Sequence, residues 1–460
     1  MNNFWDFSAW GALNLISILL LSLLATNLIK KFVKPLQNSL IPASVLGGGI
    51  LLSIAGIYRL CTGNAMFDEP FFGRNGSATL ELITYHTLAL GFIASAFKSS
   101  SGKITKQRSI EIFNTGVTTV STYLLQGTMG MAITIIAALI LPNFFPAAGL
   151  LLPFGYGQGT GQALNYGNIY QTEFGFDGGK SFGLTIAALG FLSASIGGVI
   201  HLYILKKRGK ICMEKIKQTR MLLEEIENEK EIPMQGSVDK MTIQVAFVTL
   251  AYMLTFLVMN ALGSLFPGMK SVIFGFNFLL GVLMATLMRI FLNQANKYGI
   301  FRRQQTNDFL MTRVSNFFFD IMVVAGIAAI RLDTLEKYWG ILLILGIGGL
   351  FVTYFYLRFI CKTLFADYEE EQFLAMYGML TGTASTGVIL LREIDGHFET
   401  PAADNMVYQN FPAIVFGFPL MILATLAPQA PLLTMFILFL FFVVLNAILF
   451  REQLLKKLKK

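Results

Sequence analysis

The sequence predicts an all-α polytopic membrane protein. Hydrophobic residues make up 54% of the 460-residue chain and charged residues only 13%, which is about half the charge density of an average soluble domain. Apolar runs of about 20 residues recur along the chain, and each is long enough to cross a bilayer as a helix. Polar and apolar residues do not alternate within these runs, which excludes the strand pattern of a membrane β-barrel.

About eleven apolar runs predict membrane-spanning helices. They cover residues 9–29, 40–58, 79–97, 111–141, 182–205, 241–263, 267–290, 309–330, 338–361, 409–426 and 431–450. A highly charged stretch at 206–240 is interpreted as a cytoplasmic linker between a first half, residues 1–205, and a second half, residues 241–426. Residues 427–460 are expected to add one extra helix and a basic tail.

Lysine and arginine residues predict the orientation of the chain. They gather after the first, third, fifth and seventh runs and in the final "REQLLKKLKK". Short loops rich in these residues face the cytoplasm, so we expect the N-terminus outside and the C-terminus inside the inner membrane of the cell. The net charge of +8 therefore has the distribution of cytoplasmic loops, and it does not indicate a groove for nucleic acid.

Two polar, glycine-rich segments, about 143–180 and about 364–405, interrupt the apolar pattern. The first contains "FGYGQGTGQALNYGNIY" at Phe154–Tyr170, and the second contains "GMLTGTASTGV" at Gly378–Val388. Lipid cannot replace lost helical hydrogen bonds, so such backbone must be buried in protein or line a wet cavity. We expect each segment to be re-entrant, returning to the side from which it came, or to break a helix midway.

The two halves resemble each other. Gly159 and Gly382 are separated by 223 residues in similar motifs, and Pro42 and Pro267 by 225 residues. Five spans separate the first helices of the two halves, so the repeats are expected to have inverted topology. Inverted repeats with paired broken helices are typical of secondary transporters.

The polar groups of the two segments predict a substrate-binding site. Free N–H groups at half-helix N-termini attract an anion, and exposed carbonyl oxygens can coordinate sodium. An alternative interpretation is that the small residues only pack helices closely, but their occurrence at equivalent positions in both halves favours a site. The predicted site residues are Gly157, Gln158, Gly159, Thr160, Gly161, Gln162, Thr381, Gly382, Thr383, Ser385 and Thr386.

Several of these motifs resemble the bacterial sodium:glutamate symporter family. "IPASVLGGGILL" at Ile41–Leu52 is similar to its IPEPVxGGLL segment, "YLLQG" at Tyr123–Gly127 to a glutamine-containing fourth helix, and "GQGTGQA" at Gly157–Ala163 to its GGHGTGAA signature. The likeness spans about residues 1–425. Gln158 replaces the family's usual histidine, and "MLTGTASTGVILLREID" in the second half departs from the family's GLGATPTAIANM-type stretch.

The resemblance implies a homodimeric, sodium-driven glutamate carrier in which a substrate-holding core moves against a dimeric scaffold. Gly157 to Gly161 would then form the first binding tip. Sodium would be the coupling ion, with no further cofactor. Glutamate, a related carboxylate or another amino acid would be the substrate.

Three isolated polar residues in the spans are further candidates. Asp320 lies in the middle of a span, where a carboxylate is costly; it could coordinate sodium, carry a proton or be packed and amide-paired. Gln126 could contact ligand or ion, or bond across helices. His86 is interpreted as a buried, hydrogen-bonded residue rather than a functional one.

Other function classes fit the sequence less well. A proton-coupled carrier of another small anion is the main alternative. A channel would be expected to show a filter repeated in a ring of subunits, or charged rings along a pore. An enzyme is not predicted, because the sequence has no HExxH or GxSxG motif and no paired membrane carboxylates. Cys61, Cys212 and Cys361 lie far apart and indicate neither a metal site nor a disulfide framework.

Overall fold

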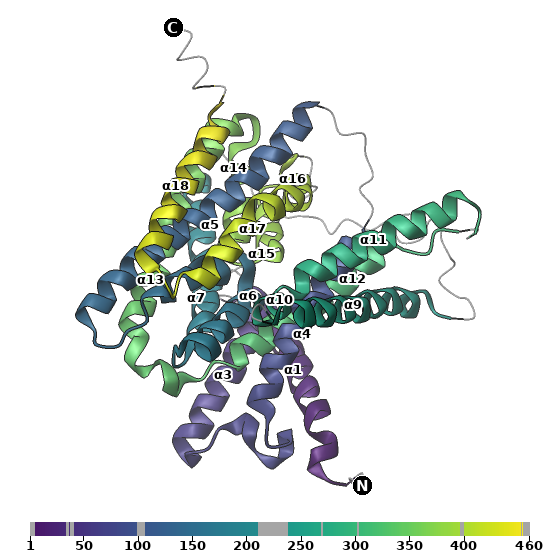
Figure 1. Cartoon of the computed structure of the whole chain (residues 1–460), viewed down its shortest axis with the longest axis vertical. Coiled ribbons are helices and arrows are strands. Elements are labelled where there is room, and N and C mark those ends of the chain that lie inside the picture. Colours follow the sequence, from purple (N-terminus) through teal and green to yellow (C-terminus); the bar gives the residue numbers. More distant parts are fainter. Residues whose placement is uncertain are drawn as a thin grey trace. The chain divides into compact units, whose positions relative to one another are not determined.

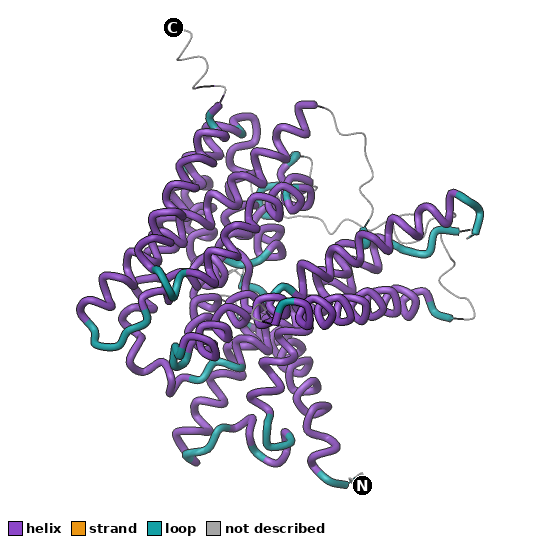
Figure 2. Tube along the Cα trace, viewed as in Figure 1, coloured by secondary structure: helices purple, strands orange, loops and turns teal. Residues whose placement is uncertain are grey.

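A computed structural model describes residues 5–33, 36, 41–98, 106–209, 238–267, 270–300, 303–395, 400–451 and 453. Within these ranges the chain consists of helices and connecting loops, with no strand (Figure 2). Most of the predicted linker at 206–240 and the end of the basic tail lie outside the described residues.

The described chain contains sixteen α-helices (Figure 1). They are α1 (Phe7–Phe32), α3 (Ala43–Thr62), α4 (Gly76–Ala96), α5 (Lys106–Ile140), α6 (Leu151–Phe174), α7 (Gly179–Lys207), α9 (Lys240–Leu265), α10 (Lys270–Gly275), α11 (Asn277–Lys297), α12 (Asp308–Ala328), α13 (Trp339–Leu364), α14 (Glu369–Thr381), α15 (Ala384–Arg392), α16 (Ala402–Tyr408), α17 (Asn410–Leu426) and α18 (Pro431–Leu449). Nine of them are long and apolar enough to cross a membrane, and α16 with α17 would supply a tenth span as a bent pair. The chain is therefore an all-α, multi-pass membrane protein, as predicted.

Two of the predicted spans differ from the others in the structure. The span expected at 79–97 is α4, which carries Glu81 and His86 and is not among the nine apolar helices. The span expected at 267–290 begins late, because α10 ends at Gly275 and α11 starts at Asn277. Oδ1 of Asn277 accepts a hydrogen bond from the backbone N–H of Phe278 at 2.7 Å, a local bond that marks the start of α11.

The helices form two compact units. The first comprises Met1–Gly76, Ile104–Lys215 and Gly326–Lys460, and the second comprises Ser77–Lys103 and Ile216–Ala325. The second unit has its own apolar core, in which Ile93 from α4 and Phe97 just after this helix pack with Val248 from α9 and Val314 from α12. These units follow a different division from the predicted halves, whose inverted repeat stays a prediction.

The 35-residue helix α5 is the central element of the first unit. Helices α6, α13, α17 and α18 pack against it (Figure 1). Its buried face is rich in threonine, and the hydroxyls of Thr118 and Thr122 donate to backbone carbonyls four residues earlier, at 2.7 and 2.8 Å. These local bonds satisfy the hydroxyls, so a polar helix can be buried between apolar neighbours.

The predicted extra helix, α18, is an integral part of this unit. It lies along α5, and Asn446 donates from Nδ2 to the Ser121 hydroxyl at 2.8 Å. The Tyr356 hydroxyl from α13 lies 2.7 Å from Ser121 Oγ and 3.0 Å from Asn446 Oδ1. Three helices are thus joined by one cluster of hydrogen bonds.

Candidate binding site at the tips of two helical hairpins

The first glycine-rich segment forms a helical hairpin. Helix α6 is broken at Gly159, whose φ of 78° and ψ of −168° are readily adopted only by glycine. The rings of Phe154 and Tyr166, on either side of the break, stack at a centroid distance of 3.9 Å. Residues twelve apart in a continuous helix would be about 18 Å apart, so the chain folds back at Gly159. Residues 146–174 are called hairpin 1, with its tip at 157–162.

The second glycine-rich segment forms a similar hairpin from α14 and α15. Gly382 and Thr383 between them have non-helical dihedral angles. Gly378 on α14 packs so closely on α15 that a Cβ added to it would lie 2.7 Å from the Cα of Gly387. Residues 369–392 are called hairpin 2, with its tip at 381–386. The predicted breaks within 143–180 and 364–405 are therefore confirmed, and they fall at Gly159 and Gly382.

The hairpins reach into the first unit from opposite ends of α5. Near the C-terminal end of α5, the Thr134 hydroxyl donates to the carbonyl of Pro146 at 2.6 Å. Near the N-terminal end, the Tyr368 hydroxyl before α14 donates to Glu111 Oε2 at 3.0 Å. Glu111 and Thr134 are 23 residues apart in one helix, or about 34 Å.

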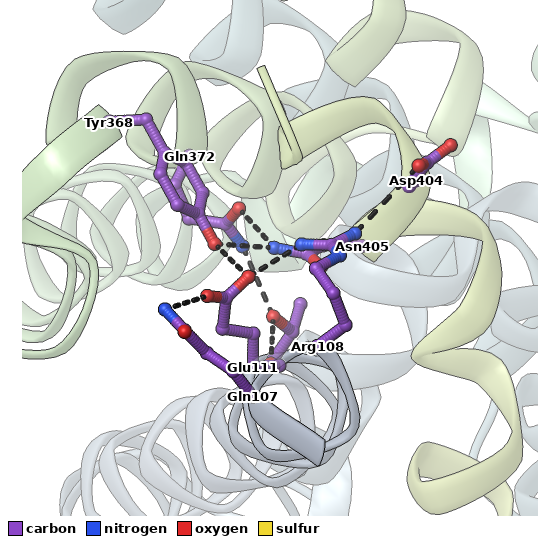
Figure 3. A network of polar contacts seen from close by, with 8 residues as sticks. Gln107, Arg108, Glu111, Tyr368, Gln372, Asp404 and Asn405 are labelled. Atoms are coloured by element: carbon purple, nitrogen blue, oxygen red, sulfur yellow. Dashed lines mark hydrogen bonds and ion pairs between the residues drawn. The ribbon is translucent and has the colours of Figure 1, made fainter. Parts of the chain in front are cut away.

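A polar network holds the base of hairpin 2 (Figure 3). Glu111 accepts hydrogen bonds from Arg108 and from Tyr368, and Asn405 Nδ2 donates to Gln372 Oε1 at 3.0 Å. Nε2 of Gln372 donates in turn to the Thr115 hydroxyl at 3.3 Å. Burial raises the pKa of the Tyr368 hydroxyl, which keeps it protonated as a donor to Glu111.

The two tips meet near the middle of α5. The Tyr123 hydroxyl donates to the carbonyl of Gly157 in hairpin 1 at 3.1 Å. One turn further along, Gln126 Nε2 donates to the carbonyl of Leu380 in hairpin 2 at 3.0 Å. Each carbonyl lies beside a helix break, where it loses its regular helical partner, the backbone N–H four residues later. Side chains of α5 therefore replace helical hydrogen bonds at both tips.

The same two tips also converge on α7. A Cβ added to Gly190 would lie 2.5 Å from the carbonyl oxygen of Thr381 and 3.1 Å from the ring of Tyr156. Because Gly190 has no side chain, Thr381 of hairpin 2 and Tyr156, just before the tip of hairpin 1, can both pack against α7 at this position. Gly190 lies near the middle of α7, as Tyr123 and Gln126 do in α5.

The tips carry polar groups that are suited to ligand binding. The side chain of Thr383 accepts a hydrogen bond from the N–H of Thr386 and so caps the N-terminus of α15. Each break also opens a helix N-terminus, which attracts negative charge, beside carbonyl oxygens, which attract a cation. Oε1 of Gln126 and Nε2 of Gln162 are buried without a hydrogen-bond partner among the described residues. Buried polar atoms without a partner are rare in proteins.

The structure brings most of the predicted site residues to these tips. Thr160, Gln162, Thr381 and Thr386 are essentially inaccessible. Gln158 is half-buried, and the side chain of Ser385 lies outside the described part of the chain. Three glycines fit the packing alternative: a Cβ at Gly157 would contact the Tyr123 ring, at Gly155 the Ile186 side chain, and at Gly167 the backbone of Gly179. Close packing and the predicted binding site thus involve the same segment.

Asp320 and His86 belong to the second unit. Asp320 has an exposed side chain on α12, whereas both tips belong to the first unit. Nδ1 of His86 lies 2.6 Å from the Tyr252 hydroxyl, which is the hydrogen-bonded arrangement expected of a structural histidine. Its side chain is exposed, however, and not buried as expected.

Sequence reasoning missed two residues that adjoin the tips. The Tyr156 hydroxyl donates to the carbonyl of Gly346 at 2.5 Å and lies 2.9 Å from the Ser193 hydroxyl. Gly190 provides the approach described above. A single tyrosine or glycine in an apolar run carries no recognisable signal, because its importance depends on helices that are distant in sequence.

A scan against protein-family models finds no match to this chain, and a search of curated proteins finds no relative. Among the described residues, no group of three or more His, Cys, Asp or Glu side chains is placed to hold a metal ion. The resemblance to sodium:glutamate symporters therefore stays a prediction.

Proposed function

We propose that the protein is a sodium-coupled secondary active symporter that imports glutamate, or a related carboxylate or amino acid, by alternating access. The meeting of two helical hairpins from opposite ends of α5 is the observation that supports this proposal. The Gly157 and Leu380 carbonyls, both bonded by residues of α5, bring the two tips together. A site between such tips can be reached from either side when one hairpin or the other moves.

The chemistry of the tips supports an anionic substrate and a cation. The N-terminus of α15, capped by Thr383, and that of residues 160–174 would attract a carboxylate. The carbonyl oxygens beside the breaks and Oε1 of Gln126 would attract sodium. In this proposal the protein lies in the inner membrane with its N-terminus outside and acts as a homodimer, which the family resemblance implies.

Proton coupling of a carrier for another small anion is the second candidate function. Asp320 on α12 favours it, because a carboxylate within a membrane-spanning helix is a typical proton carrier.

Uptake of radiolabelled glutamate into proteoliposomes tests the first candidate. We expect uptake with an inward sodium gradient and none when potassium replaces sodium. Sodium-dependent stabilisation of the purified protein without glutamate uptake would support the carrier class and direct the search to other carboxylates and amino acids. If neither effect appears, but a proton gradient drives uptake that Asp320→Asn abolishes, the second candidate is favoured.

A further inference from the structure

We propose that His201, Glu370, Arg358 and Tyr354 form a proton-binding site at the base of hairpin 2, separate from the site at the tips. His201 lies on α7, Tyr354 and Arg358 on α13, and Glu370 in the first turn of α14. The proposal goes beyond the transport function and does not depend on which solute is carried.

The contacts in this cluster are close and enclosed. Nε2 of His201 lies 3.0 Å from Glu370 Oε2, and only 4% of the His201 side chain is exposed. Arg358 donates to both oxygens of Glu370, at 2.6 and 2.8 Å. The ring of Phe373 covers the imidazole at a centroid distance of 4.4 Å. The imidazole is thus shielded from bulk water but bonded through both of its nitrogens.

The hydrogen-bond geometry accepts both charge states of His201. Glu370 is paired with Arg358, so it is ionised and only accepts, and His201 Nε2 therefore carries a hydrogen. The other nitrogen, Nδ1, lies 2.8 Å from the Tyr354 hydroxyl. A hydroxyl can donate to a bare Nδ1 or accept from a protonated one. A proton from water can therefore bind Nδ1 with no change except rotation of the Tyr354 hydroxyl hydrogen, and the imidazole gains one positive charge.

Charged side chains on the neighbouring elements lie close to the cluster. Arg358 on α13 is paired with Glu369 and Glu370 of α14, and the charges of Arg358, Glu370 and Arg208 after α7 act on Tyr354. Glu371 on α14 and Asp395 after α15 interact with each other beside these carboxylates. Imidazole is the side chain that ordinarily changes charge between pH 5 and 8.

Proton binding is linked to the position of hairpin 2. Glu370 and Phe373 both belong to the beginning of α14, whereas His201 and Arg358 belong to the helices that flank it. A charged His201 strengthens the attachment of α14 to α7. Movement of the hairpin base away from α7 would take Glu370 from the imidazole and so release the proton.

Deuterium exchange at the imidazole Cε1–H, read by mass spectrometry for each histidine peptide, tests the site in the unmodified full chain in nanodiscs. The exchange rate depends on the charge of the ring. We expect the His201 rate to show a step between pH 5 and 8.5, and Glu370→Gln to move that step to lower pH. A rate without a step, or a step that Glu370→Gln leaves in place, would overturn the proposal.

A second measurement compares melting temperatures of wild type and His201→Gln at pH 5.5 and 8.5. The additional attraction exists only while the imidazole carries its proton, so the advantage of wild type should be about 2–4 °C larger at the lower pH. An advantage that is equal at both pH values would mean an uncharged structural histidine and contradict the proposal.

Discussion

Neighbouring glycines of the first motif have different physical roles. Position 159 requires glycine because of its backbone conformation, since its φ and ψ lie in a region that other residues rarely adopt. Position 157 requires glycine because of limited space, since a Cβ there would contact the Tyr123 ring. The hydrogen bond from Tyr123 to the Gly157 carbonyl depends on that close approach. Gly159 therefore allows the chain to turn back. Gly157 allows Tyr123 of α5 to donate a hydrogen bond to the backbone carbonyl beside the break.

Replacing Gly159 with alanine is expected to destabilise the protein by about 1–3 kcal/mol, because the backbone must keep a strained conformation or the tip must rearrange. Thermal unfolding of the purified protein measures the effect. Gly49→Ala is the matched control, since Gly49 lies in α3 with no atom within 4 Å of an added Cβ; alanine in a helix should not destabilise there. Equal stability of Gly159→Ala and wild type would contradict the assigned conformation.

Thr383→Val removes the side-chain cap of α15 and should cost about 0.5–2 kcal/mol. Because the same N-terminus is the proposed anion site, we expect sodium-driven uptake to be lost in proteoliposomes while the protein still folds. Thr383→Ser keeps the hydroxyl and should retain both stability and uptake. Full uptake by the valine variant would remove Thr383 from the binding site.

At the scale of the elements, polar side chains connect helices that are otherwise apolar. The cluster of Ser121, Tyr356 and Asn446 joins α5, α13 and α18. Hydrogen bonds between membrane helices contribute modestly, typically about 0.6 and at most about 2 kcal/mol, but their geometry determines which faces of the helices meet. This cluster explains why α18 belongs to the first unit and is not a detached extra helix.

Asn446→Leu is expected to lower stability by about 0.5–2 kcal/mol, because the Ser121 and Tyr356 hydroxyls each lose a partner within an apolar environment. The change should be smaller in a Ser121→Ala background, where Asn446 keeps only its hydrogen bond with Tyr356 within the cluster, and a double-mutant cycle by thermal unfolding would show this. Leu440→Ala, an exposed position on the same helix, controls for loss of apolar surface. Additive effects of the Ser121 and Asn446 changes would mean that the two side chains are not coupled.

For the whole molecule, the positions of the two hairpin bases indicate that the hairpins enter from opposite sides of the membrane. Their bases lie at opposite ends of α5, so one of them is cytoplasmic and the other external if α5 spans the membrane. The distribution of lysine and arginine predicts which end is which. Under that orientation, the loop after α3 is external and the base of hairpin 2 faces the cytoplasm.

The native cysteines provide a test of this orientation. Cys61 is exposed in the last turn of α3, whereas Cys361 is buried. A membrane-impermeant maleimide applied to intact cells should label Cys61. Cys212, which lies in the predicted cytoplasmic linker and outside the described residues, should react only after permeabilisation, and Cys361 should resist in both cases. Labelling of Cys61 only after permeabilisation would show that the orientation is reversed.

Much of this architecture could be predicted from local patterns in the sequence. Apolar runs predicted the spanning helices, because lipid requires long apolar segments whose backbone bonds are satisfied internally. The glycine-rich interruptions predicted the two helix breaks, because such sequences are poor continuous helices. The prediction failed at the start of α11, where the break at Phe276 interrupts an apolar run without a change in composition.

The distant contacts could not be predicted in this way. Gln126 follows Tyr123 by one turn, but only the packed helices show that one reaches hairpin 2 and the other hairpin 1. Likewise, His201 contacts Glu370, which lies 169 positions later and is paired with Arg358. Hydropathy and backbone preference act within a helix turn and specify the helices one at a time. Which polar atoms meet depends on how those helices pack, and packing alone placed both tips on α5 and α7.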